Sequence, residues 1–353
     1  EQTLRLWQGL VDESARHFAA VYDLLGVQLT ADDIYGESFY NPMLADTIDD
    51  LERQGLTRLS DGAVCLFPPG FTNREGEPLP LILRKSDGGY GYHVTDLATV
   101  RYWIDKRGMT DLLYVVGAPQ AQHFQMVFAA CRQAGYLRDE NHAVHIGFGS
   151  ILGEDGKTIR TRAGDSVKLA ELLAEAVGHA ADVIAGRSQL DASTQADVAR
   201  AVGIGAVKYA DLSGDREKDY VFTWQKMLAT DGNTSVYLQY ANARVQSILR
   251  KAARPAAGTE VLLTEPAERA LALKLLQLPA AVDAAVQTYA PHKLCNYLYE
   301  TAAVFTTFYE RCPVLASNVP EPVRDSRLVL ARLTSDVLVL GLSLIGIEAP
   351  QRM

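Results

Sequence analysis

The chain has 353 residues, an apolar share of 48%, a mean hydropathy of −0.03 and a formal net charge of −9. These values are typical of a globular protein and argue against a disordered chain, while the length allows two or more domains. The acidic balance argues against a generally basic nucleic-acid binder. We expect no membrane association, because the longest apolar stretches are broken by Arg, Asp or Gly.

The cysteines are far apart in the sequence and form no CxxC pair; they are Cys65, Cys131, Cys295 and Cys312. This spacing predicts neither a disulfide framework nor a tightly bound metal. Separate buried thiols are typical of a reducing compartment, so we expect a cytoplasmic protein.

Residues 1–25 predict an amphipathic helix that ends at Gly26. A chain that starts so far inside a helix is expected to be a fragment of a longer protein.

Between residues 55 and 84, the strand-like runs GAVCLF and PLPLILRK are separated by the turn-rich PPGFTNREGEP. This pattern predicts a small antiparallel insertion.

A regular alternation of strands and helices follows. The predicted elements are a strand at 79–94, a helix at 96–107 capped by Thr95, a strand at 112–116, a helix at 121–134, a strand at 143–152, and a helix capped by Asp165 or Ser166. Strands this apolar, alternating with helices, predict a parallel sheet that is covered by helices. The predicted class is therefore α/β.

Three polar groups fall at the carboxyl ends of the predicted strands, where parallel sheets bind their ligands. They are Tyr92 with Asp96, Gln120 with His123, and the loop at 153–164. Other interpretations stay open. Asp96 could compensate a helix dipole, Tyr92 could be an ordinary half-buried strand residue, and His123 could be structural.

The rest of the chain is predicted to be a bundle of helices at 194–210, 236–253, 266–289, 292–311 and 322–346. Residues 237–353 contain 12 Lys and Arg against 10 Asp and Glu, so this part is mildly basic on an acidic body. Such a surface can bind a polyanion locally. A solvated surface of mixed charge explains the same charge distribution equally well.

Two short motifs resemble ATP-binding sequences. KTIRT, at 157–161, follows a predicted strand, and its cations could neutralise a leaving pyrophosphate; a solvated basic loop is the alternative. HIGF, at 145–148, lies inside an apolar strand run, so we interpret it as a coincidence whose glycine relieves crowding. The sequence contains no GxGxxG, GxSxG or HExxH motif.

The sequence resembles the class I arginyl-tRNA synthetases from one end to the other. The matching stretches are GESFYNPML, NREGEPLPLILRKSDGGYGYHVTDLA, ILGEDGKTIRTRAGDSVKL, AVGIGAVKYADLS, DGNTSVYLQYANAR and GIEAPQRM. The helical end resembles the DALR-type anticodon-binding domain, with DSRLVLARL at the place of the pattern that gives that domain its name.

The resemblance implies the carboxyl-terminal half of a Rossmann-like, parallel-sheet catalytic domain, followed by an all-α anticodon-binding bundle. The implied divisions are 1–165 for the partial catalytic domain, 166–235 for a helical connection after the KMSKS loop, and 236–353 for the anticodon-binding domain. The HIGH motif, the first strand of the sheet and the N-terminal domain of this family are expected to precede Glu1. HIGF cannot replace HIGH, because it lies in the wrong order and the wrong element.

The resemblance also implies roles for individual residues. Tyr92, Asp96 and Gln120 match residues that bind the arginine side chain, and His123 matches a residue beside ATP. Lys157, Arg160 and Thr161 match the catalytic KMSKS loop, with Lys157 and Arg160 also contacting ATP. The residues that match anticodon contacts are Tyr237, Tyr240 and Arg244, with Tyr309 and Met353 as weaker candidates. For each Tyr, taken alone, a packed position in the bundle core is the alternative.

The implied activity of the whole protein is arginine–tRNA ligation, with ATP as a substrate, Mg²⁺ on its phosphates, the tRNA for arginine as partner, and a monomeric state. We expect the chain to be inactive alone. A stand-alone synthetase-like protein that binds tRNA and ligates nothing is the alternative. The alternation of elements, without the resemblance, would also allow an unrelated nucleotide-using enzyme.

Overall fold

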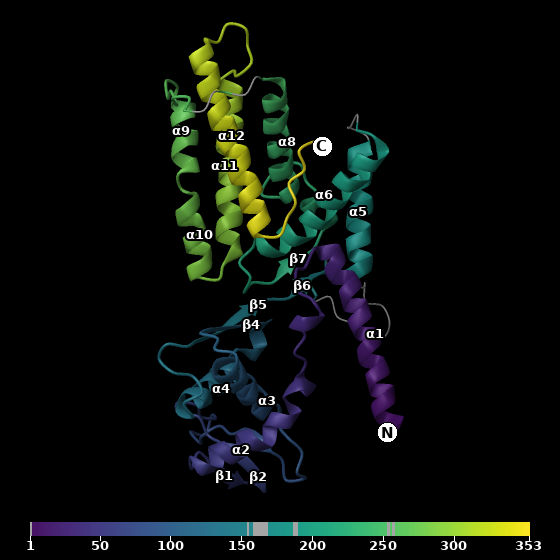
Figure 1. Cartoon of the computed structure of the whole chain (residues 1–353), viewed down its shortest axis with the longest axis vertical. Coiled ribbons are helices and arrows are strands. Elements are labelled where there is room, and N and C mark those ends of the chain that lie inside the picture. The colour runs from purple at the N-terminus through teal and green to yellow at the C-terminus, as the bar shows by residue number, and fades with distance from the viewer. Residues whose placement is uncertain (1, 154, 158–168, 186–189, 253–254, 256–257) are drawn as a thin grey trace. The chain divides into compact units, whose positions relative to one another are not determined.

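The computed structural model describes residues 2–153, 155–157, 169–185, 190–252, 255 and 258–353 (Figure 1). The chain divides into two compact units. One is Leu29–Gly149, and the other joins Glu1–Gln28 to Ser150–Met353. Each unit has apolar core clusters of its own.

The unit Leu29–Gly149 is a mixed α/β structure. Its elements are η1 (Ala31–Asp33), η2 (Glu37–Met43), α2 (Leu44–Arg53), β1 (Thr57–Ser60), β2 (Ala63–Leu66), β3 (Leu81–Arg84), α3 (Tyr92–Arg101), η3 (Tyr102–Lys106), β4 (Asp111–Gly117), η4 (Ala118–Gln120), α4 (Ala121–Gln133) and β5 (His142–Phe148). Strands β1, β2 and β3 form an antiparallel sheet in that order. The core of the unit joins α2, α3 and α4 to both sheets.

Strands β4 and β5 are parallel and in register from Asp111 opposite His142 to Gly117 opposite Phe148. Helix α4 is the crossover between them, as a parallel pair requires. One face of the pair packs into the core through Leu112 and the ring of Tyr114, which lies against α4. The other face is apolar and open, with Val115 66% exposed. The predicted parallel arrangement is confirmed for β4 and β5, whereas the first strand predicted for this sheet belongs, as β3, to the antiparallel sheet.

The predicted strand 79–94 is wrong beyond Arg84. A turn follows, in which the backbone N–H of Lys85 donates to the carbonyl of Gly89 at 2.8 Å, and α3 begins at Tyr92. The residue that starts the helix is Gly91, not the predicted cap Thr95. A Cβ on Gly91 would lie 2.1 Å from the carbonyl oxygen of Ile82, so only glycine allows this close approach.

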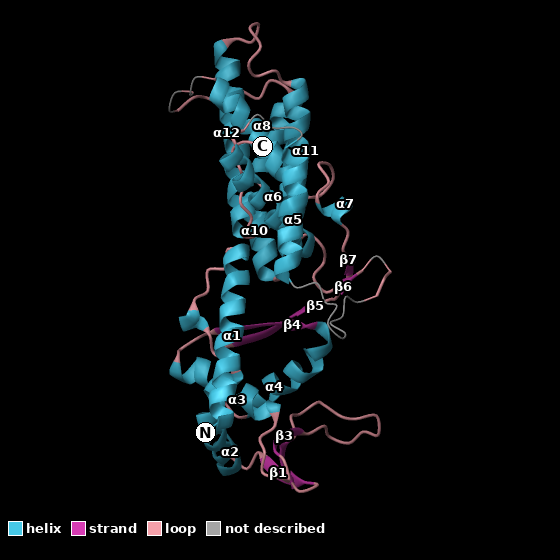
Figure 2. Ribbon diagram, turned by 90° about the vertical axis from the view of Figure 1, so that its right-hand side faces the viewer, coloured by secondary structure: helices cyan, strands magenta, loops and turns pink. Residues whose placement is uncertain are grey.

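The larger unit is mostly helical (Figure 2). Its elements are α1 (Gln2–Leu25), β6 (Ile151–Leu152), α5 (Leu169–Ala185), α6 (Ala192–Leu212), β7 (Tyr220–Val221), α7 (Trp224–Met227), α8 (Ser235–Lys251), α9 (Pro266–Leu275), α10 (Leu278–Gln287), α11 (Pro291–Arg311) and α12 (Glu321–Leu344). Strands β6 and β7 pair in parallel. Helices α11 and α12 run side by side and pack with α8 and α9 around Phe305 and Phe308.

The apolar residues of α1 do not form a buried stripe. Val21 is the buried residue of this helix, whereas Trp7 and Leu10 are largely exposed. The predicted helix is therefore confirmed, and its predicted inward face is not covered by the described residues. The packed part of α1 is its last turns, where Val21 lies against Leu173 of α5 and Ile204 of α6.

The predicted helix 266–289 is two helices, because α9 ends at Leu275 and a new helix starts with Pro279 in its first turn. Among the described residues, Pro266–Gln287 is the segment that is long and apolar enough to span a membrane by length and composition. Both of its helices pack on α11. Length and composition alone are weak evidence for a membrane span.

A buried ion pair joins α9 to α12. Nε of Arg327 donates to Oε1 of Glu268 at 2.6 Å, and the two side chains are 9% and 0% exposed. Arg327 also donates to the carbonyl of Pro313 at 2.7 Å. The second oxygen of Glu268 accepts the backbone N–H groups of Thr264 and Glu265, so it also caps the start of α9. Arg327 lies in the DSRLVLARL stretch singled out from the sequence.

Residues 346–353 follow α12 as an extended tail, which we call the C-terminal strap. Gly346, with a φ of +70°, turns the chain out of the helix. Side chains from α6 and α8 then donate to the strap's carbonyl groups: Lys208 to Gly346 at 2.6 Å, Gln239 to Glu348 at 2.7 Å, Asn242 to Pro350 at 3.2 Å and Arg250 to Gln351 at 3.0 Å. These hydrogen bonds hold the strap through its backbone.

Candidate functional site

The carboxylate of Asp96 and the imidazole of His123 form a hydrogen-bonded pair. Asp96 lies in α3 and His123 in the first turn of α4, and Oδ2 of Asp96 is 2.7 Å from Nε2 of His123. The two side chains are 25% and 23% exposed. Their partial burial strengthens the bond relative to a pair on the open surface. Because His123 contacts Oδ2, a cationic ligand is expected to approach Oδ1.

A second histidine, His93, lies beside this pair and was missed by the sequence analysis. Its ring centroid is 5.2 Å from that of His123, and its Nδ1 donates to the carbonyl of Ile82 at 3.2 Å. Burial lowers the pKa of His93 below its usual value, so its ring is neutral at pH 7. Its place one helical turn before Asp96 gave no signal, because the strand predicted to residue 94 hid the start of α3 at Tyr92. A neutral ring there leaves Asp96 as the negative charge of the group.

Tyr92 and Gln120 also lie at the N-terminal ends of these two helices. Tyr92 is the first residue of α3, one turn before Asp96, so the two side chains share a face of the helix. Tyr92 is 75% exposed, which makes the half-buried strand interpretation wrong. Gln120 is the N-cap of α4 and is exposed, three residues before His123. The structure thus brings Asp96 and His123 into contact and leaves Tyr92 and Gln120 accessible.

Of the catalytic candidates, Lys157 lies within the described residues, whereas Arg160, Thr161 and the predicted caps Asp165 and Ser166 lie outside them. Lys157 follows β6, and its backbone N–H donates to Asp155 at 3.0 Å. Its exposed ammonium lies 3.9 Å from the Asp155 carboxylate. An exposed lysine beyond the carboxyl end of a strand can reach a phosphate group.

HIGF lies within β5, as predicted. His145 donates from Nε2 to the carbonyl of Val116 at 2.9 Å, so its ring is engaged in the sheet. A Cβ on Gly147 would lie 3.3 Å from the His145 ring and 3.4 Å from Cα of Ala118. The structure therefore confirms that HIGF lies in a strand and that its glycine relieves crowding.

A second group of candidates gathers on α8 and α11. The guanidinium carbon of Arg244 lies 5.3 Å from the ring centroid of Tyr240 and 5.5 Å from that of Tyr309, within cation–π range. Tyr240 and Tyr309 are 45% and 41% exposed, so the core interpretation is wrong for both. Tyr237 lies one turn earlier, with its hydroxyl 3.3 Å from that of Thr306. We call Tyr237, Tyr240, Arg244 and Tyr309 the aromatic–arginine cluster.

The cluster adjoins a cavity of about 190 Å³ lined by Thr230, Tyr237, Tyr240, Ala241, Arg244 and Thr306. Exposed rings held by a cation beside a hollow are suited to stacking on unpaired bases. Met353 lies elsewhere. It packs against an apolar cluster formed by α5, α6, α7 and the start of α8, which includes Val198, Met227 and Val236.

Family comparisons cover both units. The family described as tRNA synthetases class I (R), catalytic domain, matches residues 1–224, and the DALR anticodon binding domain matches residues 238–353. The chain belongs to the class I arginyl-tRNA synthetase family. The predicted fold, a parallel-sheet catalytic part followed by a helical DALR bundle, is confirmed by these matches and by the β4–β5 pair.

Similar proteins from bacteria carry the same family name. The arginine–tRNA ligase of Thermobifida fusca is 51% identical over 355 residues, which cover 100% of this chain and 61% of that protein. The arginine–tRNA ligase of Frankia casuarinae is 49% identical and is covered to 60%. The chain thus spans about three-fifths of the length of these relatives.

Solved structures of the family share the fold. Arginyl-tRNA synthetase from Plasmodium falciparum matches with a TM-score of 0.87 and 29% identity, over 100% of this chain and 59% of that chain. The Thermus thermophilus arginyl-tRNA synthetase matches with a TM-score of 0.82 and 26% identity, over 98% and 65%. Both units described above therefore occur together in solved members of the family.

Proposed function

We propose that the protein to which this chain belongs is an arginine–tRNA ligase that joins arginine to its tRNA with ATP. The observation that carries the proposal is the carboxylate of Asp96, held by His123 and sharing a helix face with the exposed Tyr92. A guanidinium needs a fixed carboxylate, and a ring beside it provides a stacking surface. The names of the bacterial relatives support this choice of substrate.

The proposal assigns a role to each remaining candidate. Gln120 is placed with Tyr92 and Asp96 in arginine binding, and His123 beside the ATP. Lys157, Arg160 and Thr161 are assigned to the KMSKS loop. Fixed cations there stabilise the charge that develops on pyrophosphate as it leaves ATP, while the arginine carboxylate bonds to the α-phosphorus to form arginyl-adenylate. Mg²⁺ is expected to enter with ATP. The division into 1–165, 166–235 and 236–353, a cytoplasmic location and a monomeric state belong to the same proposal.

The proposed partner is the tRNA for arginine, bound through the aromatic–arginine cluster. Replacing Arg244 with Ala is expected to weaken tRNA affinity about tenfold or more, because it removes a charged contact worth about 1.5–3 kcal/mol. Replacing Tyr240 with Ala should have a similar effect through lost stacking, about 1–3 kcal/mol per base. Fluorescence anisotropy with a labelled tRNA transcript measures both. Wild-type affinity in both variants would remove the cluster from the RNA-binding surface.

The first measurement is the intact mass and N-terminal sequence of the protein as its own cell makes it, because these define the product whose activity is tested. That product is then assayed for attachment of labelled arginine to its tRNA. Charging that depends on arginine and ATP supports the ligase. A product that binds tRNA without charging it would favour the non-ligating alternative, which the ligase names of the relatives do not favour.

A further inference from the structure

Helix α8 has two functional faces. Tyr237, Tyr240 and Arg244 are spaced three to four residues apart and lie on the face that carries the aromatic–arginine cluster. Gln239 and Asn242 lie on another face, are fully buried, and donate to the C-terminal strap. The rotation of α8 about its axis, and with it the direction of Tyr240 and Arg244, therefore depends on what holds the buried face.

Gln239 connects three parts of the unit. Its amide nitrogen donates to the carbonyl of Ala201 in α6 at 3.1 Å and to that of Glu348 in the strap at 2.7 Å. Gly205 allows this approach, because a Cβ there would lie 3.0 Å from that nitrogen and 3.1 Å from Ile347. The same amide group thus joins α8 both to α6, through Ala201, and to the strap, through Glu348.

Asn242 extends the same connection to α12. Its amide nitrogen donates to the carbonyl of Pro350, and its oxygen accepts the hydroxyl of Ser335 at 2.7 Å. Ser335 in turn accepts a hydrogen bond from Gln246 at 2.7 Å. Buried polar chains of this kind have few alternative arrangements, because each broken bond leaves an unpaired buried group. The strap is thus fastened to α8 at defined positions.

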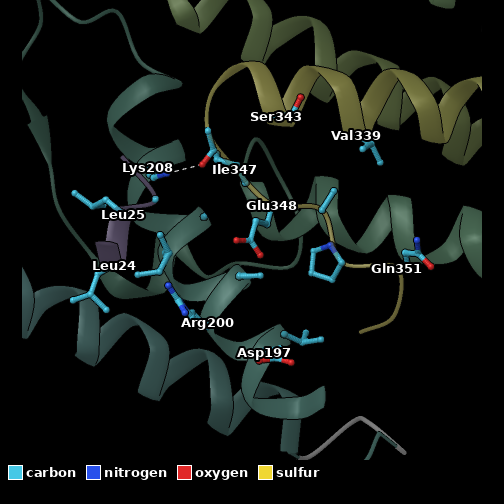
Figure 3. A pocket seen from close by; sticks show the side chains of 18 of the residues that line it. Leu24, Leu25, Asp197, Arg200, Lys208, Val339, Ser343, Ile347, Glu348 and Gln351 are labelled. Carbon is cyan, nitrogen blue, oxygen red and sulfur yellow. Dashed lines mark hydrogen bonds between the residues drawn. The ribbon is translucent and has the colours of Figure 1, made fainter. Parts of the chain in front are cut away.

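The strap also borders a cavity of about 920 Å³ (Figure 3). Its walls come from the strap, from Lys208 and neighbouring residues of α6, and from Leu24 and Leu25 at the end of α1. Lys208 points to the carbonyl of Gly346 across the edge of this cavity. Because the cavity borders the strap, the strap is not packed by protein on all sides. The four hydrogen bonds hold it there, together with the packing of Ile347 and Met353 in apolar clusters.

We propose that the C-terminal strap is a positioning element for RNA binding, which acts through Gln239 and Asn242 on the orientation of α8. The inference rests on the proposed function, and it gives the strap an indirect role: Met353 anchors the strap end in its apolar cluster, and the aromatic–arginine cluster contacts the RNA. Gln239 and Asn242 are positioning residues, because they are fully buried and bond to α6, α12 and the strap.

A double-mutant cycle on the longest form of the protein that its cell makes tests this inference. The first change is Gln239→Met, which keeps the side-chain volume and removes both donors. The second is Arg244→Ala. Gln239→Met is expected to weaken the affinity for the tRNA transcript about tenfold, about 1.4 kcal/mol, without changing the KM for arginine. Combined with Arg244→Ala it should add less than tenfold, since both changes act on the aromatic–arginine cluster.

Each outcome decides a separate point. Full additivity of the two changes would mean that the strap acts independently of the cluster, which overturns the inference. Unchanged tRNA affinity in Gln239→Met, with a folded protein by circular dichroism, overturns it as well. Unchanged affinity in Arg244→Ala alone would instead remove the proposed RNA site. If Gln239→Met does not fold, deletion of residues 351–353 is the second variant. The deletion removes the carbonyl that Arg250 binds and the packing of Met353. The same non-additivity with Arg244→Ala is expected.

Discussion

Replacing Asp96 with Asn is expected to raise the KM for arginine about ten- to a hundredfold in the ligase and to leave tRNA affinity nearly unchanged. The substitution removes the negative charge that we propose faces the guanidinium of arginine, and hydrogen bonds to charged groups are worth about 1.5–3 kcal/mol. The amide keeps the size of the side chain and can still bond to His123, so the local structure is preserved. Steady-state charging at varied arginine concentration measures the effect.

Asp111 provides a matched control in the same unit. Its carboxylate also has a histidine partner, with Oδ1 3.2 Å from Nδ1 of His142, but it lies at the start of β4, away from the carboxyl end of the strand. Replacing Asp111 with Asn should leave the KM for arginine at its wild-type value. An unchanged KM in the Asp96 variant, or an equal rise in both variants, would contradict the assignment of Asp96 to the arginine pocket.

The largest expected effect on stability comes from replacing Arg327 with Met. This change leaves the fully buried Glu268 carboxylate without its cation, and breaking a buried pair in this way costs about 3–5 kcal/mol. Urea unfolding measures the loss as a lower midpoint. The double variant with Glu268→Gln should regain most of it, because glutamine is uncharged and still offers an oxygen to the N–H groups of Thr264 and Glu265. Equal stability of the single and double variants would contradict this account.

The same pair makes the bundle sensitive to acid. Burial tends to raise the pKa of Glu268, but the N–H of Glu265 and the guanidinium of Arg327 outweigh it, so the pKa is lowered from the usual 4.5. A lowered pKa stabilises the folded state fully above pH 4.5, and this contribution is lost as the pH falls through the folded pKa. The urea concentration at the unfolding midpoint is therefore expected to decrease as the pH is lowered from 4.5. The decrease should be less steep in Glu268→Gln. Parallel pH profiles would contradict the assignment.

Sequence patterns predicted the helices and strands well and the contacts between them poorly. Strand β4 and helix α4 were predicted nearly to their ends, because an apolar strand and a helix of regular period carry strong local signals. The strand predicted at 143–152 was drawn too long, since β5 ends at Phe148 and Ile151–Leu152 is a separate strand that pairs with β7. The start of α3 was missed, since it depends on the approach of Gly91 to Ile82, a contact that no local pattern reports. The break between α9 and α10 was missed for a related reason: Pro279 is tolerated in a first helical turn, so it gave no clear stop.

The candidate site shows the same division. Tyr240 and Arg244 are one turn apart on α8, so their contact could be expected once the helix was predicted. The bond between Asp96 and His123 joins two helices whose relative placement depends on the sheet. From the sequence, each of the two residues was assigned a separate role. Tyr309 reached the list of candidates through family resemblance alone, because it is 65 positions beyond Arg244 in the printed sequence.

The anchoring of the strap has a consequence for sequence variation among relatives. All four of its hydrogen bonds end on backbone carbonyl oxygens, which every amino acid possesses. Proline at position 350 is tolerated for this reason, because it lacks only an N–H that these anchors do not use. The exposed side chains of Gln351 and Arg352 can therefore differ with little effect on these four bonds, whereas Ile347 and Met353 also hold the strap by packing into apolar clusters. The length of the strap cannot differ in this way, since one inserted or deleted residue would move the carbonyl groups beyond it away from their donors.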